Sequence, residues 1–218
     1  MTATLGVTAA ELAGAIGPEE QARLLGLPRA RVLDGELAER AAAARAWYAV
    51  HGRPFLAWRR EPLESVNAPV VRLRSGEELR SAALSRRLAS SDAHAFVALA
   101  ASAGPEVGEE ADRRWKDGRP DEAFLLDRFG ASVAERLVGW GAEALRRAAE
   151  PEGETLLPHL SPGCSDWELA DQHRLWALLF GDGSCSSGPL RILDSGGLFP
   201  RHSVLAGFGV ARGRAGVA

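Results

Sequence analysis

Two short polar turns near the C-terminal end of the chain carry residue types that could do chemistry. The first covers residues 161–166 and the second covers residues 194–202, and both contain glycine next to serine, cysteine, arginine or histidine. Each turn adjoins a segment that is expected to be regular. Backbone N–H groups and short side chains could therefore meet a ligand there, with rigid structure behind them. The rest of the chain would position the two turns.

The sequence D-S-G-G at residues 194–197 looks at first like the nucleophile turn of trypsin-like proteases. No glycine precedes it, however, and Leu198 stands where those proteases have proline. The chain also lacks a T-A-A-H-C segment and has too many expected helices for paired β-barrels. These differences argue against a serine protease.

Other nucleophile arrangements are equally weak. A triad that joins Ser195 or Ser203 to His202 is disfavoured, because neighbouring residues of a strand point to opposite faces. A hydrolase that uses His159 and Cys164 rests only on their closeness in one loop, and two ordinary loop residues are the simpler interpretation. We therefore expect no catalytic residue.

Metal and phosphate motifs are missing as well. The histidines at 51, 94, 159, 173 and 202 and the cysteines at 164 and 185 show no C-x-x-C or H-x-x-x-H spacing. No G-x-G-x-x-G follows an expected strand, and no G-x-x-x-x-G-K-[ST] occurs. The sequence predicts no metal site.

Composition excludes several classes of function. The 218 residues can bury one substantial core, and 46% hydrophobic with 25% charged residues is typical of a soluble globular protein. A net charge of −3 gives no reason to expect nucleic acid or an acidic membrane surface. Two cysteines favour a reducing compartment, and we see neither a signal peptide nor an apolar run that could span a bilayer. We expect a cytoplasmic protein.

Capping signals predict helices through the first third of the chain. Thr8 to Glu11 forms a capping box, and Pro18 can open a second helix. An alanine-rich helix is expected from Asp34 until Gly52. Together these segments would form a helical arm.

The middle of the chain mixes expected strands and helices. Residues 55–58 and 70–73 are short β-prone runs separated by a proline-bearing loop, and a second capping box at 75–78 predicts a helix. Residues 94–101 are apolar on both faces, which favours a central strand. A helix is expected to begin at Gly104-Pro105-Glu106.

The longest helix is expected over residues 121–148. Its apolar stripe consists of Leu126, Phe129, Val133, Leu137, Trp140 and Ala144. A further helix would cover residues 167–180 with Asp166 as its N-cap, and residues 190–193 and 203–210 alternate like two strands joined by a turn. The residues alone thus predict a soluble α/β domain with a concave site made of two turns.

Four segments together resemble the activation domain of cobalamin-dependent methionine synthase, and above all the stand-alone proteins of that family. They are H-L-S-P-G-C-S-D-W-E-L-A-D-Q (159–172), D-S-G-G-L-F-P-R-H-S-V-L-A-G-F (194–208), A-F-V-A-L-A-A-S-A-G-P-E-V (95–107) and D-E-A-F-L-L-D-R-F-G-A-S-V-A-E (121–135). They occur in the family's order, and the similarity covers residues 66–210.

The resemblance implies a fold and a function. The fold would be α/β, with a twisted, largely antiparallel sheet flanked by helices; residues 1–60 would be the helical arm and residues 61–218 the core. Family members that serve methionine synthase bind S-adenosylmethionine in a shallow groove and sit over the cobalamin of a partner domain. The cofactor is reduced and remethylated there after accidental oxidation. This chain would then be at most part of a cobalamin-dependent methyltransferase system, with a corrinoid-binding protein or a methionine synthase-like enzyme as its partner.

Carried over residue by residue, the family's binding site is half present. Pro162 and Gly163 match the P-G of the S-adenosylmethionine loop, but Cys164 replaces the family's tyrosine and His159 replaces its arginine. Gly139 stands where the family has an acidic residue. The binding residues implied are His159, Ser161, Pro162, Gly163, Cys164, Phe199, Pro200, Arg201, His202 and Ser203, the last five lying near the corrin.

These departures leave two readings open. A histidine holds a carboxylate by one hydrogen bond where an arginine makes two, so the resemblance implies weakened binding of S-adenosylmethionine. The first reading is a protein that docks on a corrinoid protein and assists its reactivation or methylation. The alternative is a non-catalytic binding module that docks on a corrinoid protein or binds another small ligand.

Overall fold

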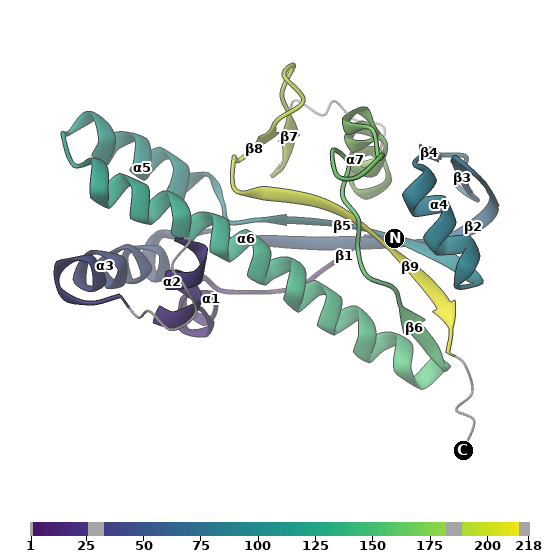
Figure 1. Ribbon diagram of the computed structural model, residues 1–218, viewed down its shortest axis with the longest axis horizontal. Coiled ribbons are helices and arrows are strands. Elements are labelled where there is room, and N and C mark those ends of the chain that lie inside the picture. The colour runs from purple at the N-terminus through teal and green to yellow at the C-terminus, as the bar shows by residue number, and fades with distance from the viewer. Residues whose placement is uncertain (1, 26–32, 182–188, 214–218) are drawn as a thin grey trace.

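The computed structural model describes residues 2–25, 33–181 and 189–213. Its centre is a seven-stranded sheet in which all neighbouring strands run antiparallel (Figure 1). The strand order is β4-β3-β2-β5-β9-β6, and β1 pairs with β2 off this path. The strands are β1 (Ala3–Thr4), β2 (Phe55–Asn67), β3 (Val70–Leu73), β4 (Glu78–Arg80), β5 (Ala93–Ser102), β6 (Glu154–Leu156) and β9 (Ser203–Arg212).

The central strand predicted over residues 94–101 is confirmed as β5. It pairs with β2 on one side and β9 on the other, and it is buried from Ala95 to Ser102. Its alternate side chains enter two different cores: Val97 and Leu99 belong to one, whereas Phe96 and Ala98 belong to the other. A strand that is apolar on both faces can be covered by helices on both sides.

Helices form the two outer layers. The first core lies between the sheet and α1 (Ala9–Ala15), α2 (Pro18–Leu24), α3 (Gly35–His51), α5 (Pro105–Lys116) and α6 (Pro120–Ala149). The second core lies between the opposite face and α4 (Ala82–Ser90) and α7 (Gln172–Phe180). Figure 1 shows α6 running across the length of the sheet, as the long helix expected over residues 121–148.

Helix signals in the first half of the chain are confirmed. Thr8 caps α1 through the expected capping box, in which its hydroxyl accepts from the Glu11 N–H. Pro18 opens α2 and Pro105 opens α5. In α6, the predicted stripe residues Leu126, Phe129, Val133 and Leu137 are all fully buried in the first core.

Two expectations for residues 55–84 are wrong. The proline-bearing loop is the second half of β2, which pairs with β5 up to Pro62 and with β3 from Leu63 onward. Proline has no N–H to donate, so it fits the point where the strand changes partners. The capping box at 75–78 starts no helix either: Gly76, with φ +97°, turns the chain from β3 into β4, and α4 is capped by Ser81.

The last third needs two further corrections. The helix expected over residues 167–180 begins only at Gln172, after the short 3-10 helix η2 (Leu169–Asp171), and Asp166 does not cap it. The strands expected at residues 190–193 and 203–210 are present as β7 (Arg191–Ile192) and β9, but the turn between them contains a further strand, β8 (Leu198–Phe199), which pairs with β7 in a separate two-stranded sheet. Another 3-10 helix, η1 (Glu150–Glu152), follows α6.

Membrane crossing by a helix requires a long apolar segment, and the described parts of the chain contain none.

Candidate functional site

The first predicted turn is a closed loop between the edge of the sheet and α7. Leu160 forms a bridge to Gly207 of β9, and the chain then turns away from the sheet. Inside the loop, the Gly163 N–H donates to the Trp167 carbonyl oxygen at 2.8 Å, and the Trp167 N–H donates to the Cys164 carbonyl oxygen at 3.1 Å. Gly163 has φ +88°, a conformation that favours glycine. These bonds hold the exposed Cys164 at the tip of the loop.

Trp167 anchors this loop in the second core. Its ring is 2% exposed and lies edge-on to Phe96, with 6.4 Å between ring centroids. Its indole Nε1–H donates at 2.8 Å to the carboxylate of Asp171, which is completely buried. That carboxylate also accepts from the Arg80 backbone N–H at 2.7 Å and pairs with Arg174. The buried carboxylate therefore ties the loop to β4 and α7 and gives it a rigid base.

Asp166 fastens the same loop to α4. Its carboxylate accepts from the Ser81 hydroxyl at 2.6 Å and from the Ala83 backbone N–H at 2.9 Å. Both donors lie at the N-terminus of α4, where free N–H groups and the helix dipole favour a negative charge. These hydrogen bonds lower the pKa of Asp166. The aspartate that the sequence suggested as a local cap thus caps a helix that lies far away in the sequence.

Part of the second turn lies against the first. A methyl group on Gly163 would come within 3.1 Å of the Leu169 side chain, and one on Gly196 would come within 2.8 Å of the same side chain. Both glycines have positive φ. Leu169 is 45% exposed although it is a large apolar residue. The structure therefore brings Pro162, Gly163 and Cys164 close to Gly196, with Leu169 between the two turns.

His159 points to the opposite face of the sheet from this cluster. Its ring centroid lies 5.4 Å from that of Phe208, which belongs to the first core, whereas Leu160 packs against the second core. His159 is exposed, but the atoms packed around its ring partly desolvate it; this, and to a smaller extent the charge of Arg87, lowers the pKa of His159. The ring is consequently neutral at pH 7. His159 and Cys164, considered above for a hydrolase, stand on different sides of the sheet edge.

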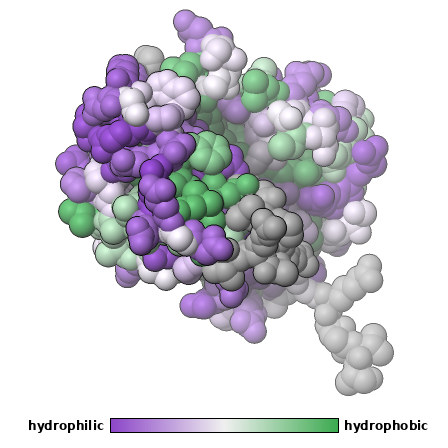
Figure 2. Space-filling view, turned by 60° about the vertical axis from the view of Figure 1, so that its left-hand side comes forward, coloured by the Kyte–Doolittle hydropathy of each residue, from purple (hydrophilic) through white to green (hydrophobic). Residues whose placement is uncertain are grey.

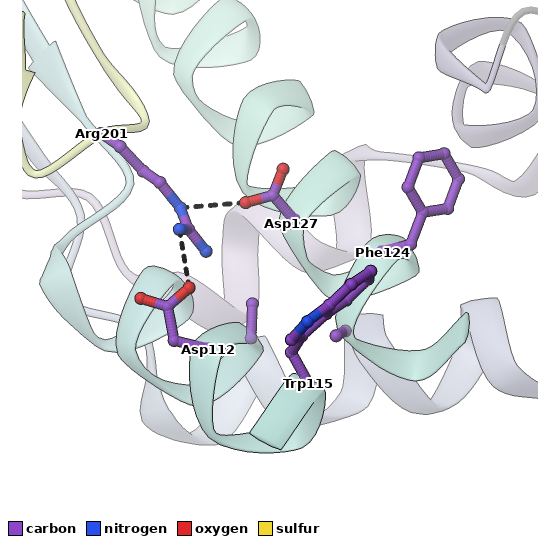
Figure 3. A pocket seen from close by; sticks show the side chains of 7 residues that line it. Asp112, Trp115, Phe124, Asp127 and Arg201 are labelled. Carbon is purple, nitrogen blue, oxygen red and sulfur yellow. Dashed lines mark hydrogen bonds and ion pairs between the residues drawn. The ribbon is translucent and has the colours of Figure 1, made fainter. Parts of the chain in front are cut away.

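The rest of the second turn binds the start of β9 to α5 and α6. Arg201 lies between two carboxylates, with Nη1 2.8 Å from Asp112 and Nε 2.9 Å from Asp127 (Figure 3). Its Nη2 donates to the Gly108 carbonyl oxygen at 3.0 Å. Arg201 is thus engaged by the helical hairpin and does not face the Ser161–Cys164 loop.

His202, Ser203, Phe199 and Pro200 are placed by similar local contacts. The His202 ring is buried over Gly130, and its Nε2 lies 3.1 Å from Asp127; burial lowers the pKa of His202 more than Asp127 raises it. Ser203 donates to the Ser102 hydroxyl at 2.8 Å. Phe199 stacks under the Arg191 guanidinium, and Pro200 is buried next to the N-terminal end of α5.

Two small clefts border this second group. One of about 220 Å³ contains Arg201, Asp112, Asp127, Trp115 and Phe124 in its wall. Another of about 210 Å³ is lined by Phe199, Pro200 and Arg201 together with the first turns of α5.

Four residues of the site could not be identified from the sequence: Leu169, Asp112, Asp127 and Asp171. Only their partners in the fold mark them out, and no local motif could have found them. Cys185 lies outside the described residues.

Possible metal ligands do not gather in the parts of the chain that the structure describes. Among residues 2–25, 33–181 and 189–213, no group of three or more histidine, cysteine, aspartate or glutamate side chains is arranged to hold a metal ion.

Comparisons with known proteins place the fold. No protein-family model matches the sequence, and no curated protein matches it significantly. Among solved structures, the chain is similar to the crystal structure of the MetH reactivation domain bound to AdoHcy, with a TM-score of 0.71. The match covers 100% of this chain and 80% of that chain at 13% sequence identity. The expected antiparallel sheet flanked by helices is therefore confirmed, and the chain has the fold of a MetH reactivation domain.

Proposed function

We propose that this chain docks on a corrinoid protein and assists the reductive reactivation or methylation of its cobalamin. What supports the proposal is the agreement of two independent observations. Sequence segments resemble the methionine synthase activation domain, and the fold, compared without reference to those segments, matches the MetH reactivation domain along the whole chain. In such a reaction a reductant supplies an electron and S-adenosylmethionine supplies the methyl group, while the protein positions the donor and excludes water.

The residues fit S-adenosylmethionine only in part. The Pro162-Gly163 turn is present and rigidly supported by Trp167, as a binding loop requires. At the position where the resemblance places an arginine, however, His159 is neutral at pH 7 because its pKa is lowered. A neutral ring donates one uncharged hydrogen bond, so it holds a carboxylate weakly. Cys164 supplies no aromatic face for the adenosyl group.

These substitutions also favour the second candidate function, a non-catalytic module that docks on a corrinoid protein or binds another small ligand. The two functions share the docking step and differ in the use of S-adenosylmethionine. In both, the groove would be formed by the Ser161–Cys164 loop and the Asp194–Gly197 part of the second turn, which meet at Leu169.

Calorimetric titration with S-adenosylmethionine and with AdoHcy tests the proposed ligand. We expect weak binding by the wild type and tighter binding by Cys164→Tyr; His159→Arg, alone or in the double variant, adds to this only if the longer side chain reaches the groove around the edge of the sheet. The arginine fork and the aromatic ring each contribute on the order of 1–3 kcal/mol when well formed, which together corresponds to roughly ten- to ten-thousand-fold in affinity.

The single variants show which side of the sheet edge the ligand contacts, because His159 and Cys164 lie on different sides of it. If each single variant gains and the double variant gains more, both positions line one groove that reaches around the edge. If the double variant gains nothing, neither position lines the groove, and the methyl donor would not be bound in the proposed way. Tight binding by the wild type would contradict a weakened site.

A further inference from the structure

We propose that the ends of α3, α5 and α6 form a docking surface for a protein segment that carries arginine or lysine beside apolar side chains. The surface consists of Leu37, Trp115 and Phe124 with the charged residues of the two clefts that adjoin Phe124. Its three apolar side chains are 43%, 65% and 54% exposed, respectively. Exposed large apolar side chains that gather in one place mark interaction sites more often than isolated ones do.

The apolar residues are contiguous. Phe124 lines the cleft that contains Trp115 and also a second cleft of about 210 Å³ that contains Leu37 and Leu125. Figure 3 shows the Trp115 ring beside the space below Arg201 and Asp127, with Phe124 turned away from Arg201. Figure 2, in which this end of the molecule comes forward, shows a hydrophobic patch with hydrophilic residues along one side of it.

The charges around the apolar residues repeat a pattern. In the first cleft, Arg201 pairs with both Asp112 and Asp127. In the second cleft, Arg40 pairs with both Glu36 and Asp121. The lining of the two clefts therefore contains four carboxylates and two guanidinium groups, a net charge of −2 from 4 − 2. His202 adds no positive charge at pH 7, because its pKa is lowered by burial.

This combination selects a cationic partner. A guanidinium or ammonium group can lie over the exposed face of Trp115 while it pairs with a carboxylate oxygen of Asp112 that Arg201 leaves free. Its alkyl stem, and an apolar neighbour in the partner, can cover Phe124 and Leu37. An acidic segment would meet the excess negative charge, so the same surface disfavours it.

The docking surface lies apart from the proposed ligand groove, and it shares only Arg201 with the residues that the resemblance places near the corrin. In Figure 1 the ends of α5 and α3 lie at one extreme of the long axis, whereas the segment that leads into α7 lies over the middle of the sheet. Failure of either proposal therefore leaves the other untouched.

The test uses two dipeptides that differ only in charge. N-acetyl-leucyl-arginine amide and the neutral isostere N-acetyl-leucyl-citrulline amide are titrated into the full chain, and the indole N–H resonances are followed by NMR. The chain has six tryptophans, so Trp115→Phe assigns the relevant resonance. We expect the arginine peptide to shift the Trp115 resonance with a Kd on the order of millimolar, and the citrulline peptide to bind at least about threefold more weakly.

Matched variants decide whether the site is local. Asp112→Asn should weaken binding of the arginine peptide by about threefold or more, as expected for the loss of one partly exposed carboxylate. Glu64→Gln removes the same charge from an exposed position on β2, away from these clefts, and should leave binding unchanged. Equal shifts with both dipeptides, equal effects of both variants, or no shift of the Trp115 resonance would each overturn the proposal.

Discussion

At the scale of single residues, one glycine determines where the second turn is held. Gly130 lies in the middle of α6, and the His202 ring rests on its backbone at the point where β9 begins. A Cβ atom at this position would lie 2.6 Å from the His202 Cδ2, which is closer than such contacts occur. The helix accepts a residue of poor helix propensity here because the ring needs the space.

Gly130→Ala should therefore destabilise the protein, although alanine is the better helix former. The gain in helix propensity is about 1 kcal/mol, whereas displacing a buried ring costs on the order of 1–3 kcal/mol. Gly139→Ala is the matched control, because Gly139 lies in the same helix with open space around it. Urea unfolding of the two variants should show a lower midpoint for the first and an equal or higher midpoint for the second. A higher midpoint for both would mean that His202 is not held against α6.

Residue chemistry could be assigned from the sequence only where a motif carried it. Pro162 and Gly163 were recognised within a longer pattern, and they do form a rigid turn. The partners of Arg201 could not be foreseen, because Asp112 and Asp127 lie on two helices many residues away. An isolated arginine in a turn carries no information about which carboxylates the fold will bring to it.

At the scale of elements, the loop of residues 161–167 and α4 form one unit. Ser81 caps α4 from within by accepting from the Leu84 N–H, and Asp166 completes the cap from outside by accepting from Ser81 and Ala83. Asp166 lies at the end of the loop whose residues from Ser161 onward are proposed to meet a ligand. These hydrogen bonds therefore help to keep that loop in a fixed conformation.

Asp166→Asn should lower the melting temperature at neutral pH. The folded protein holds the pKa of Asp166 below its ordinary value, so this carboxylate stabilises the fold above about pH 4 and loses that effect as the pH falls through the lowered pKa. The difference between variant and wild type should accordingly shrink in acid.

Asp34→Asn is the control for this experiment. Asp34 occupies the N-cap position of α3 but makes no side-chain capping bond, so its substitution should change the melting temperature little. If the two variants behave alike at every pH, Asp166 does not stabilise α4.

Elements could be predicted well where the signal was local. The helices opened by Thr8, Pro18 and Pro105 began as expected, and β5 was recognised because both its faces are apolar. The second half of β2 was missed because proline normally disfavours strands, and only the change of pairing partner at Pro62 explains its presence. The capping box at 75–78 was misleading because the same residues also suit a turn between two strands.

At the scale of the whole molecule, the sheet separates two surfaces for which we propose different ligands. Between the loop and α7, the two polar turns meet at Leu169 and offer the proposed ligand groove. At the ends of α3, α5 and α6, exposed aromatic rings and paired charges offer a protein-docking surface. The sequence could suggest the first through resemblance, but the second arises from residues on three helices that only the fold assembles.

Association with a corrinoid protein is the most direct test of the proposed function. The corrinoid proteins of the cell that makes this chain would be purified in the cob(II)alamin form, mixed with it, and examined by sedimentation and by the visible spectrum of the cobalamin. We predict a complex at micromolar concentrations with a changed spectrum. Cys164→Arg, which adds a large charged side chain at the exposed tip of the loop, should weaken the complex at least about tenfold. Ala43→Arg, the same side chain at an exposed site on α3, should leave it intact. No association with any of these corrinoid proteins, or equal effects of both variants, would contradict the proposal.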